Sequence, residues 1–388
     1  MTSGASMMRK IVVVGGSIAA VTAADSLRTN GYDGLLSVVS AESEPPYSRV
    51  PLSKGVLAGS QDPQSVWLQS LPEDVEVLLN ARATGLNIQS RRVTLAHGGS
   101  LRYDGLVIAT GAAARQLAAP GQAGELVVRD LADARAIAAR AKSASNAVVV
   151  GAGFLGMEVA STLVSLGLDV TVIDREPPLE RLLGRWLASF IVDTASSTGV
   201  RFLTSPSGVK LVGNPVEGVM LGNGTSVYAD LIVTAAGDVP AVDWLSTSGL
   251  RIAGGLVIDG CCRAASGVVA AGDVTVQEVA PGLLKRTPHW TSAVEQARTA
   301  ARFLLNPTDT RPYVSDPYFW TEQFGLDVKI SGHLPLTGSP LVVAGDPADR
   351  TALLQWSSPT GSHAAVAINY RIPVIKLKKM RGLTLSRH

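Results

Sequence analysis

The sequence predicts an α/β protein with two Rossmann-like parallel-sheet domains and a C-terminal α+β domain built on an antiparallel sheet. A glycine-rich turn directly follows a short apolar run at residues 15–20, and the same arrangement returns at residues 151–156. A strand, a glycine turn and a helix in that order are typical of a parallel-sheet unit. Residues 318–375 instead alternate apolar and polar side chains over short stretches, with no clear helix before the tail, which predicts antiparallel strands.

The elements of the two parallel units follow from apolar runs, helical spacing and turn residues. The first unit is expected to contain a strand at 10–14, a helix at 18–30, a strand at 35–39, a loop with a short helix at 43–60, short strands at 75–79 and 92–95, and a strand at 103–109. The second is expected to contain a helix at 130–142, a strand at 147–150, a helix at 154–168, a strand at 169–174, a helix at 181–198 and a strand at 227–235. A strand with a tight turn at 267–273 and a helix at 292–305 follow.

Composition limits the class of function. The chain has 388 residues, of which 46% are hydrophobic and 17% charged, so several domains with large cores are expected. A net charge of +2 is too small to indicate a nucleic-acid partner. No apolar run reaches the roughly 18 residues that span a bilayer. The first ten residues lack the order of a signal peptide, so we expect a cytoplasmic protein without a membrane partner.

Cysteine and histidine give no sign of a metal site. The two cysteines, Cys261 and Cys262, are adjacent, so the spaced pair of a redox relay is absent. We expect them to be packing residues near a strand end, with a strained vicinal disulfide as the alternative. The five histidines are scattered, and no metal ligands are expected among them: His97, His289, His333, His363 and His388.

The first glycine turn begins at Gly15 and leads into Ile18 and Ala19 at the start of the predicted helix. Ser17 stands at the second glycine position, where its hydroxyl can donate to a phosphate, and a small residue at the third position is a permitted variant. Glu42 lies 27 residues after Gly15, beyond the second strand, where an acid would accept hydrogen bonds from a ribose. A plain strand-to-helix turn is the competing interpretation.

The second glycine turn matches the dinucleotide pattern without substitution, at Gly151, Gly153 and Gly156. Asp174 ends the following strand, 18 residues after Gly156, and suits a ribose contact that would repel a 2′-phosphate. This favours NADH over NADPH, although Arg175 could pair with a 2′-phosphate. Two such turns in one chain indicate two dinucleotides, a flavin and a nicotinamide, with a hydride passed between them.

Longer motifs resemble one family. Residues 46–54, PYSRVPLSK, resemble the PYxRPPLSK segment of NADH-dependent, FAD-containing ferredoxin reductases of the putidaredoxin reductase, rubredoxin reductase and dioxygenase ferredoxin reductase type. Residues 319–323, FWTEQ, resemble the FWSDQ motif of the family, and residues 153–158 resemble its GFIGxE. The segments 109–111 and 271–273 resemble further flavin motifs, so the likeness covers nearly the whole chain.

The resemblance implies a glutathione-reductase-like fold. Residues 7–114 and 238–314 would form a discontinuous FAD-binding domain, residues 115–237 an NAD(H)-binding domain, and residues 315–388 a C-terminal domain covering the flavin. Lys54 and Glu158 are implied as catalytic residues, the lysine tuning the flavin and the glutamate pairing with it and orienting the nicotinamide. The expected FAD-binding residues are Gly15, Ser17, Ile18, Ala19, Glu42, Arg49, Lys54, Ala83, Ala109, Thr110, Gly111, Arg129, Gly272, Asp273, Trp290 and Trp320. The expected NAD-binding residues are Gly151, Gly153, Phe154, Leu155, Gly156, Glu158, Asp174, Arg175 and Gly237.

The expected function is electron transfer from NADH through FAD to a [2Fe-2S] ferredoxin, which would feed a cytochrome P450 or a ring-hydroxylating oxygenase. Val50, Ser40 and Pro288 depart from the family pattern, and Pro288 bears on the identity of the acceptor. Alternatives are an NAD(P)H-dependent reductase of a quinone or radical, and a redox-controlled association protein resembling apoptosis-inducing factor. The protein would be a monomer or homodimer. Candidate ferredoxin-docking charges, or ordinary surface charges, are Lys285, Arg286, Arg298, Arg302 and the basic tail at 376–381.

Overall fold

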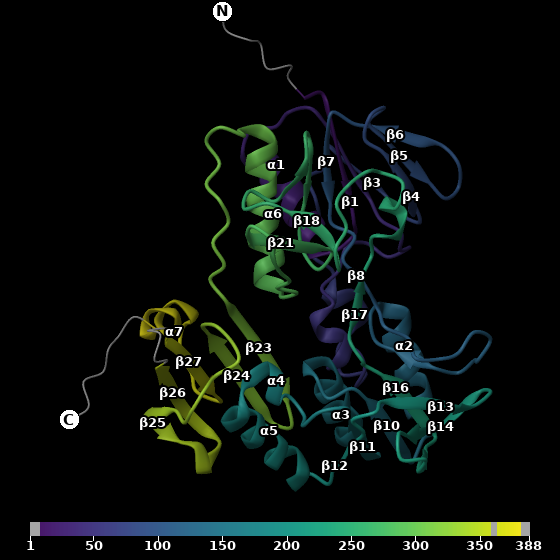
Figure 1. Ribbon diagram of the computed structural model, residues 1–388, viewed down its shortest axis with the longest axis vertical. Coiled ribbons are helices and arrows are strands. Elements are labelled where there is room, and N and C mark those ends of the chain that lie inside the picture. The colour runs from purple at the N-terminus through teal and green to yellow at the C-terminus, as the bar shows by residue number, and fades with distance from the viewer. Residues whose placement is uncertain (1–7, 358–362, 382–388) are drawn as a thin grey trace, which may run out of the picture. The chain divides into compact units, whose positions relative to one another are not determined.

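The computed structural model describes residues 8–357 and 363–381, and the chain divides into two compact units (Figure 1). The first unit comprises Met1–Ser48, Val66–Ala113 and Val239–Ser315, and the second comprises Arg49–Ser65, Ala114–Asp238 and Asp316–His388. Residue 7, where the first domain was predicted to begin, and residues 382–388 lie outside the described part. The division into three domains stays a prediction.

The first unit is built on a six-stranded sheet in the order β19-β20-β7-β1-β2-β3. Its strands are β1 (Lys10–Val14), β2 (Leu35–Val39), β3 (Val75–Leu78), β7 (Gly105–Ile108), β20 (Val268–Ala270) and β19 (Arg263–Ala265). All neighbours pair in parallel except β19, which is antiparallel to β20. The strands are nearly continuous apolar runs because both faces of the sheet are buried.

Two long helices and two small sheets complete the first unit. α1 (Ile18–Thr29) and α6 (Trp290–Leu305) pack on each other and on the parallel sheet (Figure 1). Their contact is close because alanines line it; Ala20, Ala23, Ala297 and Ala300 are all fully buried. The small sheets are β4 (Ala83–Asn87) with β5 (Arg92–Leu95) and β6 (Ser100–Arg102), and β18 (Leu256–Ile258) with β21 (Thr275–Ala280) and β22 (Leu283–Lys285); a short 3-10 helix, η3, spans Asp243–Leu245.

The second unit repeats the parallel design with a five-stranded sheet in the order β12-β11-β10-β16-β9. Its strands are β9 (Leu126–Val127), β10 (Asn146–Val150), β11 (Asp169–Asp174), β12 (Arg201–Thr204) and β16 (Leu231–Thr234). Its helices are α2 (Leu131–Ala141), α3 (Phe154–Ser165), α4 (Glu180–Leu183) and α5 (Arg185–Ser197). One apolar cluster joins the sheet to the antiparallel strands β13 (Val209–Gly213), β14 (Val216–Leu221) and β15 (Ser226–Tyr228).

The second unit also contains the predicted C-terminal antiparallel sheet, in the order β23-β24-β27-β26-β25. Its strands are β23 (Tyr318–Gln323), β24 (Leu326–Ser331), β25 (Leu341–Asp346), β26 (Thr351–Ser357) and β27 (His363–Ile368). The helix α7 (Val374–Met380) packs on β27, and β23 packs on α3 (Figure 1). The remaining elements are β8 (Ala112–Ala114) paired with β17 (Asp238–Pro240), and the 3-10 helices η1 (Val50–Ser53), η2 (Pro63–Val66) and η4 (Pro347–Asp349).

Two predicted elements were wrong because a local break interrupts an apolar run. The strand expected at 227–235 is two strands: β15 pairs antiparallel with β14, whereas β16 pairs in parallel with β10. Between them lies Asp230, whose carboxylate accepts from the backbone N–H of Ser145 at 2.8 Å. The helix expected at 181–198 is divided at Gly184, which has φ +84° and no room for a side chain beside the Leu336 carbonyl.

The parallel register determines where loop residues gather. In each parallel sheet the carboxyl ends of neighbouring strands meet at one edge, and ligands of such sheets bind outside that edge. In the first unit this edge carries the turns after Val14, Val39, Ile108 and Ala270. In the second unit it carries the turns after Val150, Asp174 and Thr234. Residues far apart in sequence are therefore brought to one edge within each unit.

The glycines of the second turn have different steric surroundings. A Cβ on Gly156 would overlap the Gly151 carbonyl oxygen, and a Cβ on Gly151 would overlap the Ala235 carbonyl oxygen. A Cβ on Gly153 would meet only Leu182 Cδ1, at 3.7 Å. The fold therefore requires glycine at positions 151 and 156 but leaves space at position 153.

We predict that Gly156→Ala lowers the free energy of unfolding. The obstacle is backbone, so helix and strand must separate, and a net loss of about 1–3 kcal/mol is expected in spite of the better helix propensity of alanine. Chemical denaturation measures the change. The matched control is Gly153→Ala, for which a change within about 0.5 kcal/mol is expected because the site is open. Equal stability of the two variants would contradict this steric account.

Candidate functional site

Two candidate nucleotide sites, called the first and second cradle, lie at the glycine turns of the two parallel sheets. The first cradle lies at the carboxyl edge of the six-stranded sheet and begins at the turn into α1. The N-cap of this helix is Ser17, whose side chain makes no capping hydrogen bond, and the first turn holds no acidic residue. By contrast, Asp130 and Asp133 close a capping box on α2. The first N–H groups of a helix need a partner, and an anion supplies one. The start of α1, at Ile18 and Ala19, therefore suits a phosphate.

The Ser17 hydroxyl contacts protein rather than open space. It donates to the Tyr47 carbonyl at 3.2 Å, and its donation to a phosphate stays a prediction. The Tyr47 phenol in turn donates to the Glu42 carboxylate. Tyr47 is almost fully buried, and through it the acid after β2 is fastened to the glycine turn after β1. Glu42 lies where an adenosine ribose acid is expected, with Ala83 at the start of the nearby strand β4.

A second turn at the same edge follows β20. Gly272 has φ +82°, and a Cβ there would lie 3.2 Å from the Cβ of Ala19. Its N–H donates to Gln296 Oε1 at 2.9 Å, which ties the turn to α6. The Asp273 carbonyl accepts from the Arg286 guanidinium at 2.8 Å. The predicted pair Gly272 and Asp273 is thus held beside the start of α1.

The neighbouring turn after β7 carries Ala109, Thr110 and Gly111. The Ala109 N–H donates to the Val14 carbonyl at 2.8 Å, which closes the glycine turn from the other side. The Thr110 hydroxyl donates to the Ala241 carbonyl at 2.9 Å, and Gly111 has φ +68°. The structure thus brings these residues to the edge that holds Gly15 and Gly272.

The start of α6 carries Trp290, which is expected near the flavin, and His289 directly before it. Trp290 is the first residue of the helix and is 39% exposed. His289 precedes it as the N-cap residue, and burial lowers the pKa of its imidazole, so the ring is neutral at pH 7.

The second cradle lies at the carboxyl edge of the five-stranded sheet, at the turn into α3. The N-cap of α3 is Gly153, and neither a side-chain cap nor an acidic residue occupies the first turn. Phe154 and Leu155 open the helix, with Leu155 38% exposed. The open space at Gly153 and the uncapped N–H groups fit a pyrophosphate.

Asp174 is fixed at the end of β11 by three backbone N–H groups. Its Oδ2 accepts from Ala152 N–H at 2.5 Å, and its Oδ1 accepts from Arg175 N–H at 2.6 Å and Glu176 N–H at 3.3 Å. The carboxylate is therefore tied directly to the glycine turn. The Arg175 side chain is exposed and its Nε donates to the Pro206 carbonyl at 3.4 Å. Gly237, with φ +99°, accepts from Arg115 N–H at 3.0 Å beyond β16.

Lys54 and Glu158 form a buried ion pair in the second unit. Lys54 Nζ lies 2.6 Å from Glu158 Oε2, and their side chains are 18% and 10% exposed. Lys54 Nζ also donates to the Val50 carbonyl at 3.2 Å. The structure confirms the predicted pairing of these two residues.

Glu158 accepts further hydrogen bonds that the sequence did not reveal. Its Oε2 accepts from the Ser53 hydroxyl at 2.7 Å and its Oε1 from the Thr321 hydroxyl at 2.8 Å. Thr162 donates to the Ser53 carbonyl at 2.7 Å. Ser53 lies on η1, Thr162 on α3 and Thr321 on β23, and these elements are remote in sequence. Ser53 and Thr321 belong to the PYSRVPLSK and FWTEQ segments, but their contacts with Glu158 cannot be read from those segments.

Three further predicted residues lie in the second unit. The Arg49 guanidinium donates to the Arg129 carbonyl at 2.7 Å, so the structure brings these two together beyond β9. The Arg129 N–H donates to Asp133, whose pKa is raised chiefly by burial. Trp320 lies on β23 and stacks on Tyr318 with ring centroids 6.0 Å apart.

The candidate docking charges divide into exposed and engaged groups. Lys285, Arg298 and Arg302 are exposed. Arg286 is engaged with the Asp273 carbonyl. In the tail, Lys378 and Arg381 both pair with Asp316, while Lys376 and Lys379 are exposed.

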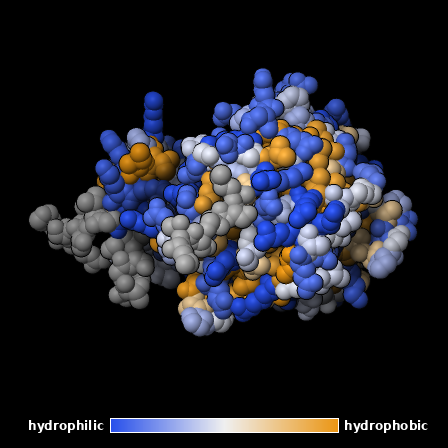
Figure 2. Space-filling view, turned by 90° about the horizontal axis from the view of Figure 1, so that it is seen from above, coloured by the Kyte–Doolittle hydropathy of each residue, from blue (hydrophilic) through white to orange (hydrophobic). Residues whose placement is uncertain are grey.

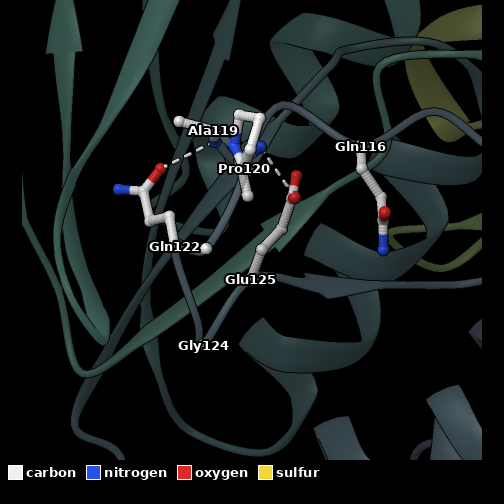
Figure 3. Close-up of a pocket in the computed structure, with 8 residues that line it drawn as sticks. Gln116, Ala119, Pro120, Gln122, Gly124 and Glu125 are labelled. Atoms are coloured by element: carbon white, nitrogen blue, oxygen red, sulfur yellow. Dashed lines mark hydrogen bonds between the residues drawn. The ribbon is translucent and has the colours of Figure 1, made fainter.

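A pocket outlined in Figure 3 belongs to the loop before β9. It has a volume of about 350 Å³ and is lined by Gln116, Ala118, Ala119, Pro120, Gly121, Gln122, Gly124 and Glu125. The Glu125 carboxylate accepts from the N–H groups of Leu117 and Ala118, at 2.8 and 2.9 Å. Gln122 Nε2 donates to the Leu211 and Gly213 carbonyls, at 3.1 and 2.8 Å, so polar groups of the loop are engaged by protein. None of the predicted site residues lines this pocket.

The surface offers no continuous apolar band in the view of Figure 2, where hydrophobic residues lie in separate groups among hydrophilic ones. Within residues 8–357 and 363–381, no helix is long and apolar enough to cross a membrane. In the same residues, no group of three or more His, Cys, Asp or Glu side chains is placed to hold a metal ion.

Comparisons with known proteins identify the family of this chain. Residues 9–299 match the model of the family described as pyridine nucleotide-disulphide oxidoreductase. The chain is 34% identical over 348 residues to terpredoxin reductase of a Pseudomonas species, which covers 85% of this chain and 83% of the relative. It is 32% identical over 374 residues to the ferredoxin–NAD(+) reductase component of the biphenyl dioxygenase system of Paraburkholderia xenovorans, covering 94% and 90%.

A solved structure extends the agreement to three dimensions. The ferredoxin reductase for the CYP199A2 system of Rhodopseudomonas palustris superposes with a TM-score of 0.85 at 29% identity, covering 93% of this chain and 91% of that one. The predicted fold class is therefore confirmed, and so is the resemblance drawn from the short motifs. The chain belongs to the pyridine nucleotide-disulphide oxidoreductase family, within its group of ferredoxin reductases.

Proposed function

We propose that this protein is an NADH-dependent reductase that passes electrons through FAD to a [2Fe-2S] ferredoxin, which serves a cytochrome P450 or a ring-hydroxylating oxygenase. The family is one of flavin enzymes that use FAD and NAD(H). When bound, FAD accepts a hydride from NADH and returns the electrons singly to an iron–sulfur centre. The residues of the chain bind and orient the cofactors and set the charge around them.

The observation that carries the proposal is the presence of two cradles of one design. Each has a parallel strand, a glycine turn, a helix start without a side-chain cap, and an acid fastened to the turn. FAD fits the first, where Glu42, Gly272 and Asp273 share an edge with Gly15. NAD(H) fits the second, where Gly153 leaves room and Asp174 accepts hydrogen bonds.

Asp174 favours NADH over NADPH. Its carboxylate accepts from three backbone N–H groups, so it is held in place with its negative charge at the strand end. A ribose hydroxyl can donate to the remaining acceptor position, whereas a 2′-phosphate would be repelled.

Lys54 and Glu158 supply the charges proposed to act beside the reacting groups. A buried ammonium stabilises negative charge that develops nearby, because a low dielectric weakens its screening. The Glu158 carboxylate keeps this ammonium in place at 2.6 Å and has lone pairs for a further donor.

The two cysteines are unsuited to a thiol relay. Both are free, and Cys262 is fully buried with its pKa raised by burial. A buried thiol held neutral is a poor nucleophile for disulfide exchange. Electron delivery by single transfers to an iron–sulfur protein therefore fits this chain better than reduction of a disulfide.

The partner is proposed to dock through charge. Exposed basic residues on one helix, Arg298 and Arg302, with Lys285 nearby in sequence, suit an acidic ferredoxin. A cytoplasmic location and a monomeric or homodimeric state stay predictions.

We predict that the purified protein binds FAD, is bleached by NADH under anaerobic conditions, and then reduces a [2Fe-2S] ferredoxin. Cytochrome c reduction should depend on added ferredoxin, because the haem protein takes electrons from the iron–sulfur centre. The matched arm replaces ferredoxin with a quinone. Equal turnover with the quinone alone would favour a small-molecule reductase, and a colourless protein unable to take up FAD would refute the proposal.

We predict that Asp174→Asn weakens the preference for NADH. The amide retains an oxygen for the Ala152 N–H but loses the charge that repels a 2′-phosphate. The ratio of kcat/KM for NADH to kcat/KM for NADPH should fall on the order of tenfold, or about 1.4 kcal/mol. Asp169→Asn, at the exposed opposite end of β11, is the control. An unchanged ratio in Asp174→Asn would remove this residue from coenzyme selection.

We predict that Tyr47→Phe weakens FAD binding. The variant removes the donor that fastens Glu42, and a hydrogen bond to a charged group contributes about 1.5–3 kcal/mol. Reconstitution of the apoprotein should show an FAD Kd raised roughly tenfold. Tyr228→Phe, at a residue 62% exposed, serves as the control. Equal Kd values in both variants would show that Tyr47 does not hold the FAD site.

A further inference from the structure

The buried carboxylate of Glu158 is held from three directions within the second unit. Oε2 receives the Lys54 ammonium and the Ser53 hydroxyl, and Oε1 receives the Thr321 hydroxyl. A carboxylate has about four acceptor positions, so one position on Oε1 remains for a ligand. The direction of that position depends on what holds Oε1.

Thr321 holds Oε1 from the C-terminal sheet. It is fully buried on β23, and its hydroxyl oxygen lies 2.8 Å from Oε1. A hydroxyl has one hydrogen to donate, and a carboxylate can only accept, so the hydrogen of Thr321 points at Glu158. Thr321 is thereby committed as a donor.

Gln323 extends the chain of hydrogen bonds from Glu158 through Thr321. Its Nε2 donates to the Thr321 hydroxyl oxygen at 3.0 Å, and its residue is 3% exposed. Its Oε1 is buried and has no hydrogen-bond partner among the described residues. An orphaned buried acceptor is unfavourable. The amide nevertheless donates its N–H to the Thr321 oxygen. Because Thr321 donates its only hydroxyl hydrogen to Glu158, it can only accept from Gln323.

The strand β23, which carries Thr321 and Gln323, contacts the helix α3, which carries Glu158, at two further places. The Phe319 and Phe154 rings meet edge to face with centroids 5.2 Å apart, and Phe324 N–H donates to Ser161 Oγ at 2.6 Å. These contacts lie on either side of the Thr321 contact along both elements. They set the register in which Thr321 reaches the carboxylate.

We propose that Thr321 and Gln323 are positioning residues, which fix the direction of the Glu158 Oε1 lone pairs and so the placement of the nicotinamide for hydride transfer. The inference rests on the proposed function, in which Glu158 contacts the nicotinamide end of NADH. Thr321 acts only through Glu158 and touches neither cofactor in this role.

The test compares Thr321→Val with Thr194→Val in the FAD-loaded enzyme. Both remove a buried hydroxyl, but Thr194 donates at 2.9 Å only within its own helix, to the Phe190 carbonyl. Anaerobic stopped flow measures the limiting rate of flavin bleaching and the Kd for NADH. Thr321→Val should lower the limiting rate on the order of tenfold and change Kd less than about twofold, because only orientation is lost. Thr321→Ser should restore the rate, and Thr194→Val should match the parent protein.

The same substitution in a Glu158→Ala protein distinguishes an effect of Thr321 on the position of Glu158 from a general effect on packing. In a Glu158→Ala protein, adding Thr321→Val should cause no further loss of rate, because the group through which Thr321 acts is gone. Equal rates for Thr321→Val and Thr194→Val, no rescue by serine, or a full further loss in the Glu158→Ala background would each overturn the inference. Failure of the proposed function looks different, since the parent protein itself would not be bleached by NADH.

Discussion

The close approach of backbone to backbone at the glycine turns is the constraint on which both nucleotide cradles depend. At Gly151 and Gly156, strand, helix and the neighbouring strand β16 come so near that a single methyl group would overlap a carbonyl oxygen. The same closeness brings the start of α3 against the edge of its sheet, where its N–H groups can meet an anion. The requirement for glycine and the ability to bind an anion therefore both follow from this close approach of helix and strand.

The two turns meet this constraint differently. In the second, glycine occupies all three positions and leaves an open space at Gly153. In the first, Ser17 and Ala20 take the second and third positions, Ala20 is fully buried, and the Ser17 hydroxyl is engaged by the Tyr47 carbonyl. Each turn nevertheless fastens its acid, through the Tyr47 phenol for Glu42 and through the Ala152 N–H for Asp174. A side chain in one unit performs the role that backbone performs in the other.

Sequence reasoning found the parallel strands and the antiparallel C-terminal sheet. Buried apolar runs such as β1 and alternating apolar and polar runs such as β24 can be recognised from the hydrophobic pattern alone. It missed the break at Asp230, since the residues on both sides are apolar and only the pairing partners differ. It paired Glu158 with Lys54 but did not reveal the hydrogen bonds that Glu158 accepts from Ser53 and Thr321. The Lys54–Glu158 pair is also distant in the sequence but was implied by the family resemblance, whereas a lone hydroxyl in a sequence carries no sign of its partner.

The segment Arg49–Ser65 belongs with the second unit although the chain on both sides of it belongs to the first. Lys54 and Ser53 therefore reach Glu158 from outside the continuous stretch 114–238, and Thr321 reaches it from beyond that stretch as well. A chimera made by exchanging only that stretch between two reductases would combine the glutamate of one parent with the lysine, serine and threonine of another. The second unit can therefore be transferred intact between proteins only as three separate pieces of polypeptide.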